Sequence, residues 1–428
     1  MRYFIFLSAS LLLFFTACQH PSEDFRLNSA DYESFLQHDS QEDLKKMEEN
    51  FDFWQAKYEQ NPNQYPYLQK MAAVKSQLFS LRADISDLKD SEKFLTKAVE
   101  QTHAQNSAIL RSLSRNYISQ HRFKEALALL EQAEALGDKL FATHCMLFDV
   151  HVELGNNEKA GTYLNRIAHE QNFDYLIRMA KWQDHKGNLD TAIDFMEKAL
   201  ALGERDRNES QLSWTYSNLG DFYGHAGEIE QAYQHYLKAL ELNPADTYSK
   251  KGIAWIAYSH EKNTDEALRI LNMLQHQSQS PDLLEFEGEI AEFEGKIVEG
   301  EKAQQAFLSE IRREEFGSMY NKYQVGLFAE KESSQEVALK IAEEELNDRP
   351  SPQSYSLKAW ALFKSGKTDA AYQLMKEEVE GKCFEPDVLF QMAEVYKAKE
   401  ENIDGLKAEL LSSSFELGPL MMEKVRKL

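Results

Sequence analysis

A recurring pair of amphipathic helices constrains this chain more than any other feature of its sequence. Within Trp214–Pro244, small and apolar side chains follow the spacing of a helical face in two successive runs. The first run is Leu219, Gly220 and Tyr223, and the second is Ala232, Tyr236, Ala239 and Leu240. Ala226-Gly227-Glu228 interrupt the pattern between the runs, as a tight turn does. The segment therefore predicts an αα-hairpin.

The same hairpin pattern recurs along most of the chain. Its units are 32 to 40 residues apart and start at Ser107, Phe141, Phe173, Ser213, Tyr248, Pro281, Met319 and Pro352. Only a small residue lets the two helices approach at the twentieth position of a unit. The residues found there are Ala126, Ala160, Ala192, Ala232, Ala267, Gly300, Ala338 and Ala371. A weaker unit from Ala72 has Ser91 there, and we expect the charged segment Leu202–Ser210 to be a linker between hairpins.

These units resemble the tetratricopeptide repeat (TPR), a hairpin of 34 residues. The signature residues in this chain are Leu219, Gly220, Tyr223, Ala232, Tyr236, Ala239 and Pro244. The resemblance implies an all-α, right-handed superhelical solenoid of about nine clear repeats, with partial repeats at both ends. It places N-terminal helices or a partial repeat over 32–71, the TPR array over 72–385, and a partial repeat with a C-terminal capping helix over 386–428. In that last unit Gly405 takes the twentieth position, and the capping helix starts near Pro419.

The first residues form a separate unit. Arg2 precedes an apolar run, Ile5–Phe15, that is too short to span a bilayer. The following Thr16-Ala17-Cys18 resembles the lipobox of bacterial lipoproteins, in which the cysteine is lipidated. The resemblance implies a signal peptide over 1–17, a lipidated Cys18 with a polar tether over 18–31, and the outer membrane of a Gram-negative type of cell envelope, with its face left open. An ordinary cleaved signal peptide is the alternative.

The net charge limits the partners of the chain. With 48 basic and 71 acidic residues, the chain carries a formal charge of −23. This charge excludes a nucleic acid as the expected partner and disfavours unassisted docking on anionic lipid. We therefore expect a protein or peptide partner, and a membrane contact made through the N-terminal lipid.

Cys145 and Cys383 are expected to be buried, inert thiols. The units that hold them are separated by five others, and a solenoid repeat is expected to touch only its neighbours. An intramolecular disulfide is therefore not predicted.

No motif for catalysis is found. The sequence lacks the GxSxG, HExxH and GxxxxGK[ST] patterns, so we expect no enzymatic activity, no cofactor and no metal site. His185, His225 and His260 occupy the same position of three consecutive units, which faces the concave groove in TPR proteins. They are predicted to be polar groove residues, because stacked repeats hold equivalent atoms about 10 Å apart, too far for one zinc ion. Whether they have a role stays open.

The TPR resemblance also implies which side chains line the groove. One stripe, Glu285, Glu289 and Glu292, is acidic and would suit a basic or amine-bearing ligand. A second set, Tyr320, Tyr323, Trp360 and Phe363, is aromatic and would suit a peptide, a partner helix or a sugar. The alternative for these rings is packing against neighbouring helices.

The predicted function is a membrane-anchored TPR scaffold or adaptor in the cell envelope, which holds a protein partner in its concave groove. The alternative is a surface or periplasmic lipoprotein that binds a small ligand or glycan as an accessory to an import system, using the aromatic set.

Overall fold

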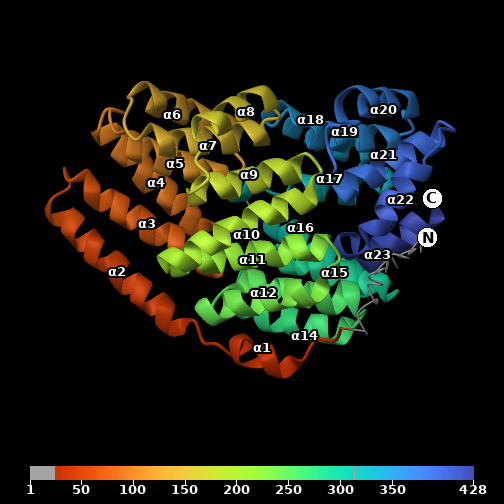
Figure 1. The fold of residues 1–428 in the computed structure, drawn as a ribbon, viewed down its shortest axis with the longest axis horizontal. Helices are drawn as coiled ribbons and strands as arrows, with labels where there is room; N and C mark the ends of the chain where they lie inside the picture. Colours follow the sequence, from red (N-terminus) through yellow and green to blue (C-terminus); the bar gives the residue numbers. More distant parts are fainter. Residues whose placement is uncertain (1–24, 313) are drawn as a thin grey trace, which may run out of the picture.

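The computed structural model describes residues 25–312 and 314–428, which form a wound stack of helices (Figure 1). The predicted signal peptide and Cys18 lie outside the described residues. Two helices precede the stack, α1 (Ser29–Leu36) and α2 (Gln41–Gln60). The helices of the stack are α3 (Tyr65–Arg82), α4 (Ile85–Gln101), α5 (Ser107–Ser119), α6 (Phe123–Ala135), α7 (Leu140–Glu153), α8 (Asn157–Arg166), α9 (Phe173–His185), α10 (Leu189–Asp206), α11 (Glu209–His225), α12 (Ile229–Leu242), α13 (Thr247–Trp255), α14 (Thr264–Gln275), α15 (Asp282–Phe293), α16 (Ile297–Ile311), α17 (Asn321–Ala329), α18 (Gln335–Asp348), α19 (Pro352–Lys364), α20 (Thr368–Leu374), α21 (Pro386–Ala398), α22 (Asp404–Ser412) and α23 (Ser414–Lys427).

Consecutive helices from α3 to α22 pair as hairpins, which confirms the predicted all-α solenoid. Two helices end in a π-helical turn, η1 (Ile256–His260) after α13 and η4 (Met375–Val379) after α20. Short 3-10 turns, η2 (Glu314–Phe316) and η3 (Glu332–Ser334), flank α17. Side-chain caps fix several helix starts: the Asn106 side chain accepts from the backbone N–H groups of the first turn of α5.

Small residues at the twentieth position bring the two helices of each hairpin together, as predicted. The alanines there, from Ala126 to Ala371, are fully buried. Ser91 is also fully buried, and its hydroxyl donates to the backbone carbonyl of Ala72 on the facing helix. Gly405 departs from the pattern, because it is exposed and no atom lies near its missing side chain. The prediction for Gly405 is therefore wrong, since α22 does not pack there.

The Tyr236 ring is held between two glycines from neighbouring repeats. A Cβ atom on Gly220 would lie 2.4 Å from this ring, and one on Gly252 would lie 2.5 Å from it. Because real Cβ atoms do not approach so closely, α11 and α13 can approach Tyr236 only without side chains at these two positions. Gly227 closes the α11–α12 turn with a φ of 79°, which glycine adopts at no steric cost.

Two predicted boundaries are corrected. The segment Leu202–Ser210 is not a linker: α10 continues to Asp206 and α11 begins at Glu209, so the extra residues lengthen two helices. Residues 25–31, which the sequence predicts to be part of the tether, pack on the solenoid instead. The ring of Phe25 contacts Tyr233, the backbone N–H of Leu27 donates to the Glu261 carboxylate, and α1 packs on α12 and α14. The predicted start of the array at Ala72 falls inside α3.

The solenoid winds far enough for later repeats to touch earlier ones (Figure 1). The Arg349 guanidinium binds the Glu153 carboxylate at 2.6 Å, and its Nε donates to the Glu153 carbonyl. Nearby, a Cβ on Gly155 would meet the carbonyl of Pro350, and the Phe384 ring lies against Gly187. Ile85 and Leu88 share a second cross-turn cluster, with Phe307, Ile311, Phe316 and Tyr320. The expectation that each repeat touches only its neighbours is wrong, because the superhelix returns on itself.

The two cysteines are buried and free, as predicted for inert thiols. Burial raises the pKa of Cys145 to about 11 and that of Cys383 to about 12. Thiols with such pKa values are poor nucleophiles at neutral pH.

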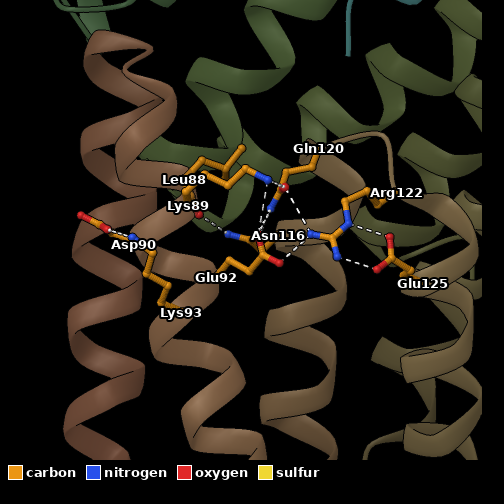
Figure 2. Close-up of polar contacts among 9 residues, drawn as sticks. All are labelled: Leu88, Lys89, Asp90, Glu92, Lys93, Asn116, Gln120, Arg122 and Glu125. Carbon is orange, nitrogen blue, oxygen red and sulfur yellow. Dashed lines mark hydrogen bonds and ion pairs between the residues drawn. The ribbon is translucent and has the colours of Figure 1, made fainter. Parts of the chain in front are cut away.

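A polar network joins the α3–α4 hairpin to the next one (Figure 2). Glu92 of α4 accepts from Arg122 at 2.6 Å and from the Gln120 amide at 2.9 Å, and Lys89 donates to the same amide's oxygen. Asn116 of α5 donates to the Leu88 carbonyl. Since these charges are paired with one another, the network holds the stacking of repeats and leaves little for a ligand to bind.

We expect Gly252→Ala to destabilise the fold, because its methyl group would overlap the buried Tyr236 ring. Overpacking of this kind costs about 1–3 kcal/mol, which would lower the midpoint of urea unfolding. Gly326→Ala is the matched control, since Gly326 lies in α17 with no atom within 4 Å of the added carbon. An unchanged midpoint for Gly252→Ala would show that α13 does not pack on Tyr236 as described.

We expect Arg349→Ala to lower the free energy of unfolding by about 1–2 kcal/mol at pH 7, because it removes a contact between two turns of the superhelix. Burial alone would raise the pKa of Glu153, but attraction to Lys181 and Arg349 outweighs it and lowers the pKa to about 2. The pair therefore stabilises the fold above about pH 4.5, and this contribution is lost as the pH falls toward 2. Urea unfolding at several pH values should show the difference from wild type shrinking in that window. Lys340→Ala, at an exposed residue of α18, is the control.

Candidate binding pocket on the concave face

A cavity of about 390 Å³ lies where the first helices of three central repeats meet the end of the chain. We call it the acidic pocket. Its lining residues are Asp221, His225, Tyr236, Tyr248, Lys251, Gly252, Trp255, Asp282, Glu285, Phe286, Tyr323, Phe415 and Glu416. They come from α11 to α17 on one side and from α23 on the other, so hairpins far apart in sequence build one site.

Asp221 forms one wall together with two tyrosines. The Tyr236 hydroxyl donates to one carboxylate oxygen at 2.7 Å, and the Tyr248 hydroxyl donates to the other at 2.5 Å. Burial raises the pKa of Asp221, although both hydrogen bonds oppose this effect. The Tyr236 ring is fixed by the two glycines described above, so the Asp221 carboxylate is held in place at the cavity.

A second wall carries carboxylates of α15 that lack matching cations. Lys251 donates to Asp282 at 3.2 Å. Within the described part of the chain, the Glu285 carboxylate has no hydrogen-bond or ion-pair partner, whereas its backbone N–H donates to the Pro281 carbonyl. Burial and the neighbouring Asp282 raise its pKa. One turn further, Glu289 accepts from the Tyr258 hydroxyl at 3.1 Å, and burial and Glu285 raise its pKa too. The folded chain thus holds carboxyl groups close to one another without full neutralisation.

The third wall is the end of the chain. Trp255 Nε1 and the Ser259 hydroxyl both donate to the Phe415 carbonyl, at 3.0 and 2.6 Å. The Phe415 ring fills the space that a side chain at Gly224 would occupy. Beside it, a Glu416 carboxylate oxygen lies 3.8 Å from His225 Nδ1. The helix predicted to cap the last repeat therefore also reaches the central repeats.

The acidic character continues beyond the pocket. Lys322 pairs with Asp387 at 2.8 Å. Burial, followed by repulsion from Asp387 and Glu416, raises the pKa of Glu385 to about 7. Burial also raises the pKa of Asp184. Carboxyl groups with raised pKa values therefore also lie outside the pocket, on α9 and directly before α21.

The three histidines do not converge. His225 lines the acidic pocket. His185 stacks on Trp182 and bonds to Asn157 at 3.0 Å, and burial lowers its pKa. His260 is exposed, with Phe25 of the N-terminal segment as its ring neighbour. Only His225 is therefore placed to meet a ligand in the pocket.

Only some of the predicted groove residues line the acidic pocket. Glu285 and Tyr323 line the pocket, Glu289 lies one turn beyond it, and Glu292 is exposed outside it. The aromatic set does not form a binding surface: Tyr320 is buried against Phe307 and Phe316, and Trp360 is buried beside Phe363 and Phe390. For Tyr320 and Trp360 the alternative of core packing is correct, because cross-turn and next-repeat contacts cover both rings.

Sequence reasoning missed much of the pocket. Asp221 and Tyr248 stand at helix positions that repeat spacing identifies as groove-facing or adjacent, so a full list of groove positions would have found them. Phe415 and Glu416 carry no such signal, because their place depends on the return of the superhelix.

The described residues contain neither a candidate metal site nor a candidate membrane span. No group of three or more His, Cys, Asp or Glu side chains among them is arranged to hold a metal ion. None of the helices described has the length and apolar character needed to cross a bilayer.

Comparisons with known proteins point to one repeat family. Residues 173–245, which contain α9 to α12, match the family model described as tetratricopeptide repeat. Among curated proteins, the Protein O-mannosyl-transferase TMTC1 of Homo sapiens is 24% identical over 156 residues, which are 36% of this chain and 17% of that protein. The chain thus matches only a small part of that relative.

Three solved structures that align with this chain have low sequence identity to it. YrrB, a TPR protein described as having an unusual peptide-binding site, is 19% identical with a TM-score of 0.28, over 46% of this chain and 95% of its own. Yeast Tom70 is 16% identical with a TM-score of 0.35, over 93% of both chains. A human IFIT1 dimer with PPP-AAAA is 15% identical with a TM-score of 0.46, over 73% of this chain and 71% of its own.

The family match falls on the segment whose hairpin signature is clearest in the sequence, from Phe173 to the turn after α12. The hairpins before and after it share its buried alanines and its stacking. Residues 173–245 are therefore similar to tetratricopeptide repeats, and they lie in the middle of a longer solenoid of helix hairpins.

Proposed function

We propose that this chain is a non-catalytic scaffold that holds a basic segment of a protein partner in the acidic pocket. The observation that carries the proposal is the charge of the pocket lining. It contains four carboxyl groups, those of Asp221, Asp282, Glu285 and Glu416, but one lysine, Lys251. A lysine or arginine side chain entering the pocket would complete the missing ion pairs.

The walls of the pocket also suit a cation. Trp255, Phe286 and Tyr323 present aromatic rings to the same cavity as the carboxylates. Aromatic faces attract ammonium and guanidinium groups, and most strongly where water is excluded. Tyr323 is 36% exposed and Tyr248 is 50% exposed, so the pocket has an accessible rim.

The size of the cavity limits the ligand. At about 390 Å³, it lies near the lower end of the range for ligand pockets. It accepts one or two side chains with their backbone, rather than a folded domain. This favours an extended or terminal segment of the partner, captured by side chains on rigid helices.

The glycan-binding alternative has less support. It relied on an aromatic surface formed by Tyr320, Tyr323, Trp360 and Phe363, and two of those rings are buried in the core. The pocket that does exist is lined by carboxylates, which favour a cationic ligand over a neutral sugar.

The proposed cellular location of the scaffold depends on the N-terminal sequence. Thr16-Ala17-Cys18 after a short apolar run supports a lipid anchor at Cys18, in the outer membrane of a Gram-negative type of cell envelope. The lipid would anchor the chain in the membrane, and the pocket would bind the partner.

We expect Glu285→Gln to lower the affinity for a blocked hexa-arginine peptide by about ten-fold, since one lost charged contact is worth about 1.4 kcal/mol. Binding is measured by fluorescence polarisation at low salt. Glu292→Gln is the matched control, because Glu292 lies on the same helix but is exposed and outside the pocket. Equal losses in both variants would indicate attraction to the whole surface rather than to the pocket.

The same Glu285→Gln variant should be more stable than the wild type at pH 8. The pKa of Glu285 is raised, so its ionisation destabilises the fold as the pH rises above about 4.5. Replacement by a neutral amide removes this penalty, which we put at about 1–2 kcal/mol after allowing for solvent at the pocket. Urea unfolding at pH 4 and pH 8 measures it. A variant less stable than the wild type at pH 8 would contradict this expectation, because it would mean that ionised Glu285 stabilises the fold.

We expect Cys18→Ser to abolish lipid attachment and release the chain from membranes. The measurement is incorporation of a labelled fatty acid, together with membrane fractionation, in a Gram-negative host. Cys145→Ser is the control, because Cys145 is buried in the solenoid. Membrane association that survives Cys18→Ser would contradict the lipid anchor.

A further inference from the structure

We propose that α23 is a clasp of the acidic pocket: its docking on the central repeats closes the pocket over a bound cation, so that docking and binding strengthen each other. The inference rests on the proposed function, because it takes a cationic segment as the ligand. It adds that the end of the chain regulates how tightly this ligand is held.

The clasp joins two parts of the superhelix. On one side, Leu417, Met422 and Val425 are buried in the core formed by α17 to α22. On the other side, the beginning of α23 packs on α11, η1 and α15. The helix therefore spans the gap between the last repeats and the central ones, and Figure 1 shows it between α22 and α15.

Close fits hold the clasp against the central repeats. Trp255 and Ser259 share one acceptor, the Phe415 carbonyl, and the Phe415 ring fits over Gly224. Gly418 has a φ of 70° and breaks the helix, which lets the chain approach Trp255. A Cβ at Gly418 would lie 2.9 Å from the Trp255 ring. Because these fits leave no free space, the free energy of docking is sensitive to one added methyl group, and it also depends on the charges at the docked surface.

The ligand and the clasp fit together rather than compete. Phe415 and Glu416 line the same cavity as Asp282 and Glu285, so the cavity lies between the clasp and α15. If α23 filled the ligand site, no such space would remain beside it. A cation in this space contacts both walls at once, which is the condition for positive coupling.

The charges around Glu416 explain why docking of α23 and binding of a cation should strengthen each other. Docking brings Glu416 toward Asp184, Asp387 and Glu385, which repel it. The basic groups facing it from the packed elements are the His225 imidazole of α11, 3.8 Å away, and the Lys322 ammonium group of α17, which already binds Asp387. A bound guanidinium group would offset this repulsion and stabilise the docked helix.

The test uses hydrogen exchange of the full chain with and without the blocked hexa-arginine peptide. We expect the peptide to slow amide exchange in residues 414–427. Gly418→Ala should weaken docking and lower the affinity for the peptide by about five-fold or more. Gly405→Ala is the control, because its added carbon meets no atom within 4 Å, and it should bind like the wild type.

A second variant keeps the proposal testable if Gly418→Ala fails to fold. Glu416→Gln should slow exchange in α23 without the peptide, because the repulsion is gone, and should lower the peptide's affinity. Faster exchange of α23 on peptide binding would overturn the clasp and indicate competition. Unchanged exchange in α23, with normal affinity in both variants, would also overturn the clasp but leave the pocket intact. No binding to the wild type would overturn the proposed function and the clasp with it.

Discussion

The return of the later repeats to the middle of the chain is the constraint on which the rest of this structure depends. Arg349 binding to Glu153, Pro350 against Gly155 and Phe384 against Gly187 fix how far the superhelix winds. With this winding, α23 reaches α11, η1 and α15, and an open concave face becomes a lined pocket. The binding site is thus a consequence of superhelical closure as much as of the residues in any one repeat.

Some carboxyl groups inside this superhelix lower the stability of the fold. Carboxyl groups whose pKa values are raised by burial and by neighbouring carboxylates make the fold less stable as the pH rises. A structural core has no need of such groups, whereas a binding site for a cation does. The network around Glu92 and Arg122 offers the contrast within the same chain, because its charges are paired and it serves the stacking of repeats (Figure 2).

The local part of the fold could be predicted from the sequence, because it depends on local packing rules. The alanines at the twentieth positions and the fit of Gly220 to Tyr236 follow from the approach of two helices within one hairpin. The closure could not be predicted, because it sums small rotations over many repeats and leaves no local pattern. For the same reason the sequence leaves open whether Trp360 and Tyr320 line the groove or pack in the core, and it carries no signal for the role of Phe415.

The acidic pocket is tested most directly by the protons released when a cation binds. Titration calorimetry of the blocked hexa-arginine peptide at pH 7, in two buffers of different ionisation enthalpy, measures this number. Because burial and neighbouring carboxyl groups raise the pKa values of Glu285 and Glu289, a guanidinium group bound beside them should lower those values and release protons. Binding heats that differ between the buffers, with a net release lost in Glu285→Gln, would support the pocket as the site. Binding with no proton exchange would contradict it.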